Sequence, residues 1–307
     1  MTKNKIIIIS GPTASGKSGL GLELAKKING VIINADSMQV YKGLPILSAQ
    51  PNLEEQKQIP HFLYSVLEPT QNCSVGIWLD LVKNEIEKAL AQNQVPIIVG
   101  GTGMYISKLI DGISLIPEVS EKVRKETSDL YEKIGYEEFY KLAKNIDEIA
   151  VGNLNKNDKQ RLTRVYEVFQ ETNSKLSDLQ KLENQKLYEA EQFFHININP
   201  KSREQLYDNC NKRFIQMLEN SAIEEVESFM QKYPEVVNKT LGLEELILLI
   251  QNKISKQEAI KTATQKTRNY AKRQLTWFRN QFDKKNLEIG EVVNKDNITR
   301  VLELIKK

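Results

Sequence analysis

The chain has 307 residues, of which 40% are hydrophobic and 27% charged, a balance typical of a globular protein with a sizeable core. The net charge is only +3, so attraction to a nucleic acid or an anionic surface must come from local patches rather than from the whole molecule. Cys73 and Cys210 have neither a zinc-ligand spacing nor a disulfide framework, and the apolar run near the N-terminus is too short for a signal peptide or a membrane span, so we expect a cytoplasmic protein.

The first half of the chain alternates between predicted strands and helices. Residues 6–9 are four isoleucines, which predict a fully buried strand, and a glycine-rich loop and a helical pattern follow them. Apolar runs at residues 31–33 and from residue 95 predict two more strands, with a helix over residues 78–90 between them. This order predicts an α/β fold whose parallel sheet is flanked by helices and binds ligands at the carboxyl ends of its strands.

Residues 116–192 have few β-branched residues, many lysines, glutamates and asparagines, and repeated helical periodicity. We therefore predict an all-helical insertion domain over this range. A strand over residues 193–198 follows, closed by Pro200, and the pattern is then helical to about Phe282. Residues 1–115 and 193–307 are expected to form one P-loop core that carries basic helices near its C-terminus.

The loop after the first strand reads GPTASGKS and matches the pattern GxxxxGK[ST] between a strand and a helix, which is the context the motif requires. Such a loop directs backbone N–H groups at phosphate oxygens, while Lys17 adds a point charge and Ser18 is placed to ligate Mg²⁺. The alternative is a glycine turn that begins a helix by chance. We predict that a di- or triphosphate binds to Gly11, Pro12, Thr13, Ala14, Ser15, Gly16, Lys17 and Ser18.

The third strand ends in the cluster Gly100, Gly101, Thr102 and Gly103, where a nucleotide hydrolase or kinase would carry a metal-binding aspartate. The glycines are expected to let a ligand approach the backbone, and Thr102 could donate to a phosphate oxygen or simply cap the next helix. The nearest acid is Asp36, after the second strand. On the residues alone it is a general base, a metal contact or a helix cap.

The other notable feature lies between Lys253 and Lys285, a segment that contains ten lysines and arginines but only two acids and therefore has a charge of about +8. An apolar stripe runs along its helix and is bordered by cations and aromatic residues. A surface of this kind suits a phosphate backbone with unstacked bases, and the alternative is a solvated basic helix. The stripe comprises Ile260, Ala263, Thr267, Ala271, Leu275, Phe278 and Phe282.

A smaller basic element lies in the insertion. Arg161 and Arg164 are one turn apart on a predicted helix whose cap is expected near Asn157 or Asp158. By itself this pair is weak support for an RNA contact.

Five blocks resemble the tRNA dimethylallyltransferases in order and spacing, and together they span residues 5–282. They are GPTASGKS (11–18), ADSMQVYKG (35–43), PIIVGGTGMYI (96–106), NKNDKQRLTRVYEV (155–168) and TRNYAKRQLTWFRNQ (267–281). The resemblance implies transfer of a dimethylallyl group from dimethylallyl diphosphate to N6 of the adenosine on the 3′ side of the tRNA anticodon, with Mg²⁺ as cofactor. The P-loop would then hold a diphosphate leaving group.

The resemblance also implies roles for individual residues. Asp36 would accept the N6 proton, and Thr102 and Arg124 would contact the departing phosphates; nothing in the sequence pattern itself distinguishes Arg124. The extruded adenosine, a base that must leave its stack to be reached, would be bound by Asp36, Ser37, Met38 and Gln39. Contacts to the anticodon arm are implied for Gln160, Arg161, Leu162, Thr163, Arg164, Tyr270, Lys272 and Arg273. We expect a monomer with no membrane partner.

Three positions depart from the family pattern. Phe62 replaces the second histidine of a usual pair, Asn209 stands where an arginine is common, and Glu244 replaces a base. Because these positions are expected to lie outside the phosphate site, they are expected to affect tRNA affinity more than the chemistry.

Two other functions stay open from the sequence. A P-loop kinase of a small metabolite, with Asp36 as base, would turn over ATP but gives no reason for the basic helix. A tRNA-binding module with a decayed catalytic site would bind tRNA without prenyl transfer, and the presence of Lys17, Ser18 and Asp36 argues against it.

Overall fold

The computed structural model describes residues 5–114, 116–152, 154–155, 158–200, 202–236, 238–281, 287–289 and 295–306. The chain divides into two compact units, one formed by Met1–Ile110 with Leu187–Lys307 and the other by Asp111–Lys186. The second unit begins and ends a few residues before the expected limits of 116 and 192. An antiparallel bridge between Ile113 and Gln185 closes its base, which explains the shift.

The first unit is built on a sheet in which every observed strand pairing is parallel, as predicted. The strand order is β3-β2-β4-β1-β5-β6. The ends of β1 and β4 are in register, with Ser10 opposite Gly100, so the loops that follow them begin side by side. The strands are β1 (Ile6–Ser10), β2 (Gly30–Asn34), β3 (His61–Phe62), β4 (Val95–Gly100), β5 (Phe193–Ile198) and β6 (Leu287–Ile289).

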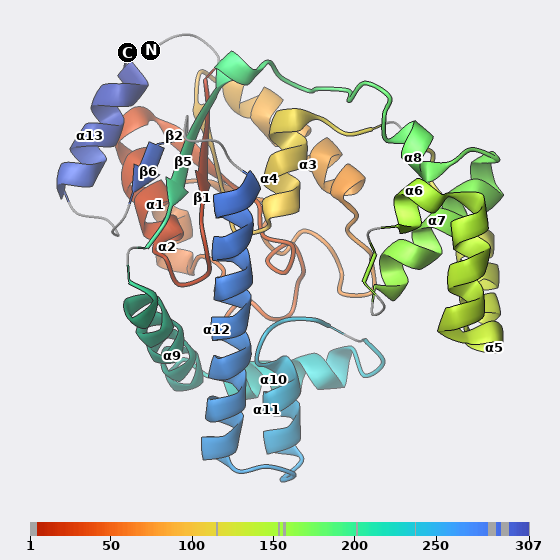
Figure 1. Cartoon of the computed structure of the whole chain (residues 1–307). Coiled ribbons are helices and arrows are strands. Elements are labelled where there is room, and N and C mark those ends of the chain that lie inside the picture. Colours follow the sequence, from red (N-terminus) through yellow and green to blue (C-terminus); the bar gives the residue numbers. More distant parts are fainter. Residues whose placement is uncertain are drawn as a thin grey trace. The chain divides into compact units, whose positions relative to one another are not determined.

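The central strands are buried on both faces, which explains why β1 is a run of isoleucines and does not alternate. Alternate residues of β1, β4 and β5 pack with α1 (Lys17–Ile28) and α13 (Lys295–Lys306) in one core. Figure 1 shows α3 (Val75–Ala91) and α4 (Gly103–Asp111) on the opposite side of the sheet. The predicted strands at residues 6–9, 31–33, 95 onward and 193–198 are confirmed. The short β3 and β6 were not predicted, because two or three residues carry no readable period.

The remaining helices of this unit form a second core. They are α9 (Arg203–Glu219), α10 (Ala222–Lys232), α11 (Leu243–Ile250) and α12 (Lys256–Gln281), and the turn at Leu44 and Leu47 packs among them. In Figure 1, α9, α10 and α11 lie beyond the carboxyl ends of the strands, so they border the region where a parallel sheet binds ligands. One more short helix, α2 (Leu53–Gln58), has no buried residue.

The second unit is helical, as predicted, and has its own core around Phe139, Leu162 and Val165. Gly135 has non-helical backbone angles inside the first helix and divides it into the two periodic stretches seen in the sequence. The helices are α5 (Glu121–Ile146), α6 (Glu148–Val151), α7 (Lys159–Thr172) and α8 (Leu176–Leu179). Among the described residues, no helix of either unit combines the length and apolar character needed to cross a bilayer.

Candidate active site

The loop between β1 and α1 has the geometry of a phosphate cradle. Gly16, the N-cap of α1, has a φ of 85°, a left-handed angle that glycine adopts without strain, so the loop can fold over the free N–H groups of the helix. Lys17 Nζ donates to the Pro12 carbonyl oxygen at 2.6 Å. The Ser15 hydroxyl is buried without a hydrogen-bond partner among the described residues. This loop therefore presents donors that an anion could satisfy.

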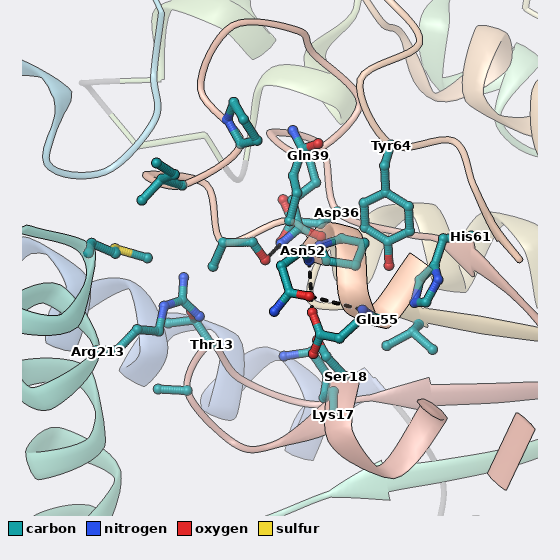
Figure 2. A pocket seen from close by; sticks show the side chains of 18 of the residues that line it. Thr13, Lys17, Ser18, Asp36, Gln39, Asn52, Glu55, His61, Tyr64 and Arg213 are labelled. Carbon is teal, nitrogen blue, oxygen red and sulfur yellow. Dashed lines mark hydrogen bonds between the residues drawn. The ribbon is translucent and has the colours of Figure 1, made fainter. Parts of the chain in front are cut away.

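A cavity of about 1160 Å³ lies against the loop. Its other walls are the turn after β2, residues 45–56, residues 61–65 and one face of α9, all within the first unit. Figure 2 shows side chains from these segments converging on one space, with Lys17 and Ser18 on one side and Arg213 on another. The labelled lining residues are Thr13, Lys17, Ser18, Asp36, Gln39, Asn52, Glu55, His61, Tyr64 and Arg213.

Asp36 is held in the cavity wall by its own turn. Its N–H donates to Asn34 Oδ1 at 2.8 Å, and its Oδ1 accepts from the Met38 N–H at 2.9 Å. The helix-cap interpretation is wrong, because the residues that follow form a turn and no helix. One carboxylate oxygen thus fixes the turn, and the other has no hydrogen bond to a described residue, which suits a proton acceptor.

Arg213, on α9, was missed by the sequence reasoning. Burial lowers its pKa, and the Asp36 carboxylate opposes that effect. Burial likewise lowers the pKa of Lys17 to about 8, with Asp36 opposing and Arg213 adding to the shift. Two partly buried cations therefore share the cavity with one carboxylate, an arrangement that attracts a polyanion.

A signal for Arg213 was present in the sequence. Positions 209, 213 and 216 of α9 and its C-cap at 220 are polar at helical spacing and line the cavity, on the face next to the buried Leu206, Cys210 and Phe214. Such a polar stripe also occurs on any solvated helix face. Only the fold shows that this one lines a cavity.

The glycine cluster after β4 has a different purpose from the one expected. A Cβ at Gly100 would lie 2.1 Å from the Ala35 carbonyl oxygen, one at Gly101 would lie 2.4 Å from Gln274 Nε2, and one at Gly103 would lie 2.2 Å from the Trp277 ring. The space is thus filled by protein, and two of the three neighbours come from α12. Gly100 lines the cavity, whereas Gly101 and Gly103 do not, so the expectation that these glycines open the backbone to a ligand is corrected for Gly101 and Gly103.

Thr102 lies at this turn and contacts the segment that follows Asp36. Its Oγ1 accepts from the Ser37 N–H at 2.9 Å and donates to Ser37 Oγ at 3.3 Å. Its carbonyl oxygen accepts the first hydrogen bonds of α4, from Tyr105 and Ile106, but its side chain does not cap that helix. The structure thus brings Thr102 to the Asp36 turn and does not place it among the residues that line the cavity.

One of the three departures from the family pattern lies at the site. Asn209 Nδ2 donates to the Ala14 carbonyl oxygen of the P-loop at 3.3 Å and lines the cavity, so the expectation that it lies outside the phosphate site was wrong. Glu244 lies on α11 and pairs with Lys266 Nζ at 2.5 Å, beside the buried Glu245. Phe62, on β3, is half-buried and does not line the cavity.

The predicted apolar stripe of α12 is confirmed at Ala263, Thr267, Ala271, Leu275 and Phe278, all buried, while Ile260 is only partly buried and Phe282 lies outside the described residues. The buried face of α12 also contains two polar residues that the pattern missed, Thr264 and Gln274.

Beside this stripe, α12 carries the predicted basic and aromatic face. Lys272 and Arg273 are exposed, and the Arg273 guanidinium lies 5.7 Å from the centre of the Tyr270 ring. Burial and the nearby Asp36 carboxylate raise the pKa of Tyr270, so this face reaches the turn that carries Asp36. A groove of about 540 Å³, lined by these cations and Trp277, continues along the helix.

In the second unit, the predicted block at residues 160–164 lies at the start of α7. Asp158 caps the helix by accepting from the Arg161 N–H at 3.2 Å, while Asn157 lies outside the described residues. Arg161 is exposed, but Leu162 is only 1% exposed and packs in the core of the unit, so its side chain supports the helix and is not available to RNA.

The arginines of this unit form a cluster. Burial lowers the pKa of Arg164; Glu167, 3.9 Å away, opposes that effect and the nearby Arg124 guanidinium adds to it. Arg124, on α5, therefore lies near Arg164 and Glu167, which are both on α7. Two cations that share one acid leave positive charge for an anionic ligand.

The sheet order and the loop after β1 place the chain among the P-loop α/β proteins, and glycine at the end of β4 separates it from those that hold a metal there with an aspartate. The chain belongs to the IPP transferase family, whose model matches residues 39–281.

Relatives agree with this assignment. A tRNA dimethylallyltransferase of Ehrlichia canis (strain Jake) is 42% identical over 284 residues, which are 91% of this chain and 93% of the relative. One of Rickettsia bellii (strain OSU 85-389) is 38% identical over 99% of this chain and 98% of its own length.

Two solved structures are also similar. The full-length tRNA isopentenylpyrophosphate transferase of Bacillus halodurans has a TM-score of 0.68 at 29% identity and covers 99% of this chain and 96% of its own. A eukaryotic dimethylallyltransferase, described as acting on tRNA, has a TM-score of 0.76 at 27% identity and covers 90% of this chain and 70% of its own.

Proposed function

We propose that the protein transfers the dimethylallyl group of dimethylallyl diphosphate to N6 of the adenosine on the 3′ side of the tRNA anticodon, and releases diphosphate. Family membership supports the reaction. The observation that carries the site assignment is the meeting of Lys17, Arg213 and Asp36 in one cavity beside the P-loop. The cations suit a diphosphate, and the carboxylate suits a proton acceptor.

The chemistry requires both kinds of group. The lone pair of the adenine N6 amine is delocalised into the ring, so the nitrogen attacks only as the allylic C–O bond weakens. As the N–C bond forms, the electron pair of the C–O bond leaves with the diphosphate, where Lys17 and Arg213 stabilise the added charge. The proton released by N6 passes to Asp36, whose other neighbours hold its turn in place.

Mg²⁺ is part of the proposal, and the residues present fit it. Ser18 has an exposed hydroxyl on the cavity wall at the start of α1. No group of three or more histidine, cysteine, aspartate or glutamate ligands occurs in the described part of the chain. Mg²⁺ at phosphate sites takes many of its oxygens from substrate phosphates and water, so the Ser18 hydroxyl would be one protein ligand among them. The ion would add positive charge at the diphosphate.

The remaining predicted contacts have unequal support. Gln39 donates to the carbonyl oxygens of Ser48 and Ala49, so its amide nitrogen holds the cavity wall and its oxygen is left for a base. Thr102 and Arg124 stay predictions as phosphate contacts. For the RNA, the exposed Lys272 and Arg273 and the neighbouring Tyr270 form the supported surface on α12.

Incubation of the purified protein with radiolabelled dimethylallyl diphosphate, Mg²⁺ and unmodified bacterial tRNA, followed by nucleoside mass spectrometry, tests the proposal. Label on the adenosine next to the anticodon is expected. Binding of tRNA without labelling would indicate a tRNA-binding module that has lost catalysis. Turnover of ATP with neither tRNA binding nor labelling would indicate the kinase alternative. Each of these results contradicts the proposal.

A further inference from the structure

Gln274 lies on the buried face of α12, where the other buried polar residues, Thr264 and Thr267, donate to carbonyl oxygens of their own helix. It is 6% exposed and lies between Ala271 and Leu275, which are also buried. A buried amide costs free energy unless both of its ends are hydrogen-bonded, and both are. Its Oε1 accepts from the Thr13 N–H at 2.8 Å, and its Nε2 donates to the Gly101 carbonyl oxygen at 2.8 Å. One side chain thus joins α12 to the loops after β1 and β4.

Both contacted loops belong to the candidate active site. Thr13 is in the P-loop, and fixing its N–H sets the direction in which the following amides point. Gly101 immediately precedes Thr102, which is bonded to the Ser37 N–H next to Asp36. Gly101 also fits Gln274 sterically, because a Cβ there would lie 2.4 Å from Nε2. The amide and the glycine are therefore complementary.

The same turns of α12 carry the exposed basic side chains on their outer face. Tyr270 is one turn before Gln274, Arg273 is adjacent to it, and Trp277 packs over Gly103. A helix is stiff over two turns, so side chains that bind RNA and the amide that holds the P-loop move together. The position of the loop is thus set from the helix that carries the RNA-facing cations.

We propose that Gln274 is a positioning residue that holds the P-loop in its diphosphate-binding form from the RNA-facing helix. The proposal deepens the proposed function and rests on it. Gln274 itself touches neither substrate. Gln274 also hydrogen-bonds Tyr270. Its loss is expected to weaken diphosphate binding much more than tRNA binding, because the exposed Lys272 and Arg273 stay in place.

The test replaces Gln274 by methionine, which keeps the length of the side chain but removes the N–H donor and the strong acceptor. Calorimetric titration with inorganic diphosphate and Mg²⁺ should give a Kd raised about tenfold, as expected for a lost buried hydrogen bond at a charged site. The Kd for tRNA should stay within about twofold, because loss of one internal contact leaves the phosphate-facing cations unchanged. Gln257→Met, on an exposed position of the same helix, is the matched control and should change neither value.

A second route reaches the same amide from the other side. Gly101→Ala should displace Gln274 and weaken diphosphate binding to a similar extent, and this effect should largely vanish when Gln274→Ala is also present. An unchanged diphosphate Kd in both Gln274→Met and Gly101→Ala, or an equal loss of tRNA affinity, would overturn the inference. If the wild-type protein itself failed to bind diphosphate, the proposed function would fall instead.

Discussion

Replacement of Asp36 by asparagine should change catalysis and ligand binding in opposite directions. Asparagine has the shape of aspartate, and its Oδ1 can still accept from the Met38 N–H that fixes the turn. The substitution removes the proton acceptor and the negative charge, and leaves the backbone of the cavity wall as it is. Asparagine therefore tests the charge of Asp36 more specifically than alanine, which would also remove the hydrogen bond with the Met38 N–H.

The two effects can be estimated separately. Loss of a general base typically costs about 10²–10⁴ in rate, so kcat should fall by that amount. The Asp36 carboxylate acts on both Lys17 and Arg213, the cations that would meet the diphosphate. Removing a charge that repels an incoming polyanion in a partly solvated site is worth of the order of 1 kcal/mol, so diphosphate should bind about fivefold more tightly.

Single-turnover prenyl transfer measures the rate, and calorimetric titration with inorganic diphosphate and Mg²⁺ measures the affinity. Asp80→Asn, at an exposed position on α3, is the control for a general loss of charge. A rate within threefold of wild type would remove Asp36 as the base. Weaker diphosphate binding would mean that the carboxylate holds the ligand, for example through a metal ion, and would refute the electrostatic reasoning.

Three further results are expected. Lys17→Met should abolish diphosphate binding yet raise the Tm at pH 7, because the pKa of Lys17 falls from 10.5 to about 8 on folding and the charged lysine therefore destabilises the folded protein. The gain in Tm should fade between pH 8 and 10.5, and a lower Tm at pH 7 would contradict the assignment. Arg213→Met should raise the KM for dimethylallyl diphosphate about 10- to 100-fold, the value of a charge-assisted hydrogen bond, with tRNA affinity unchanged; an unchanged KM would exclude Arg213 from the phosphate site. Lys272→Ala should weaken tRNA binding and reduce the slope of log K against log salt by about 1, and an unaltered slope would show that Lys272 meets no phosphate.

Part of the site could be predicted from the sequence, because the residues that form the P-loop are contiguous. The P-loop needs glycine, lysine and serine at fixed spacing, and the strand before it must be apolar on both sides, so both could be predicted. Arg213 and Gln274 could not. Arg213 belongs to a polar stripe that any solvated helix face can show, and Gln274 lies on a stripe predicted as apolar; what each contacts is set by how α9 and α12 pack beyond the sheet.

The glycines after β4 also show what sequence reasoning could not predict. Their sequence predicts that a ligand approaches the backbone, but side chains of α12 occupy the space beside Gly101 and Gly103. Whether the neighbour is a ligand or protein depends on segments far along the chain, here Gln274 and Trp277. Asn209 is similar, because its contact with Ala14 spans 195 positions.

The sequence by itself determined the fold class, the P-loop and the basic helix, since local propensity, periodicity and motif spacing are properties of neighbouring residues. The tertiary structure decided which side chains share the cavity, which hydroxyls and amides are already engaged, and how burial alters the pKa of Lys17 and Arg213. Those properties depend on solvent exclusion and on charges brought together from distant segments, and neither exists before the helices have packed on the sheet.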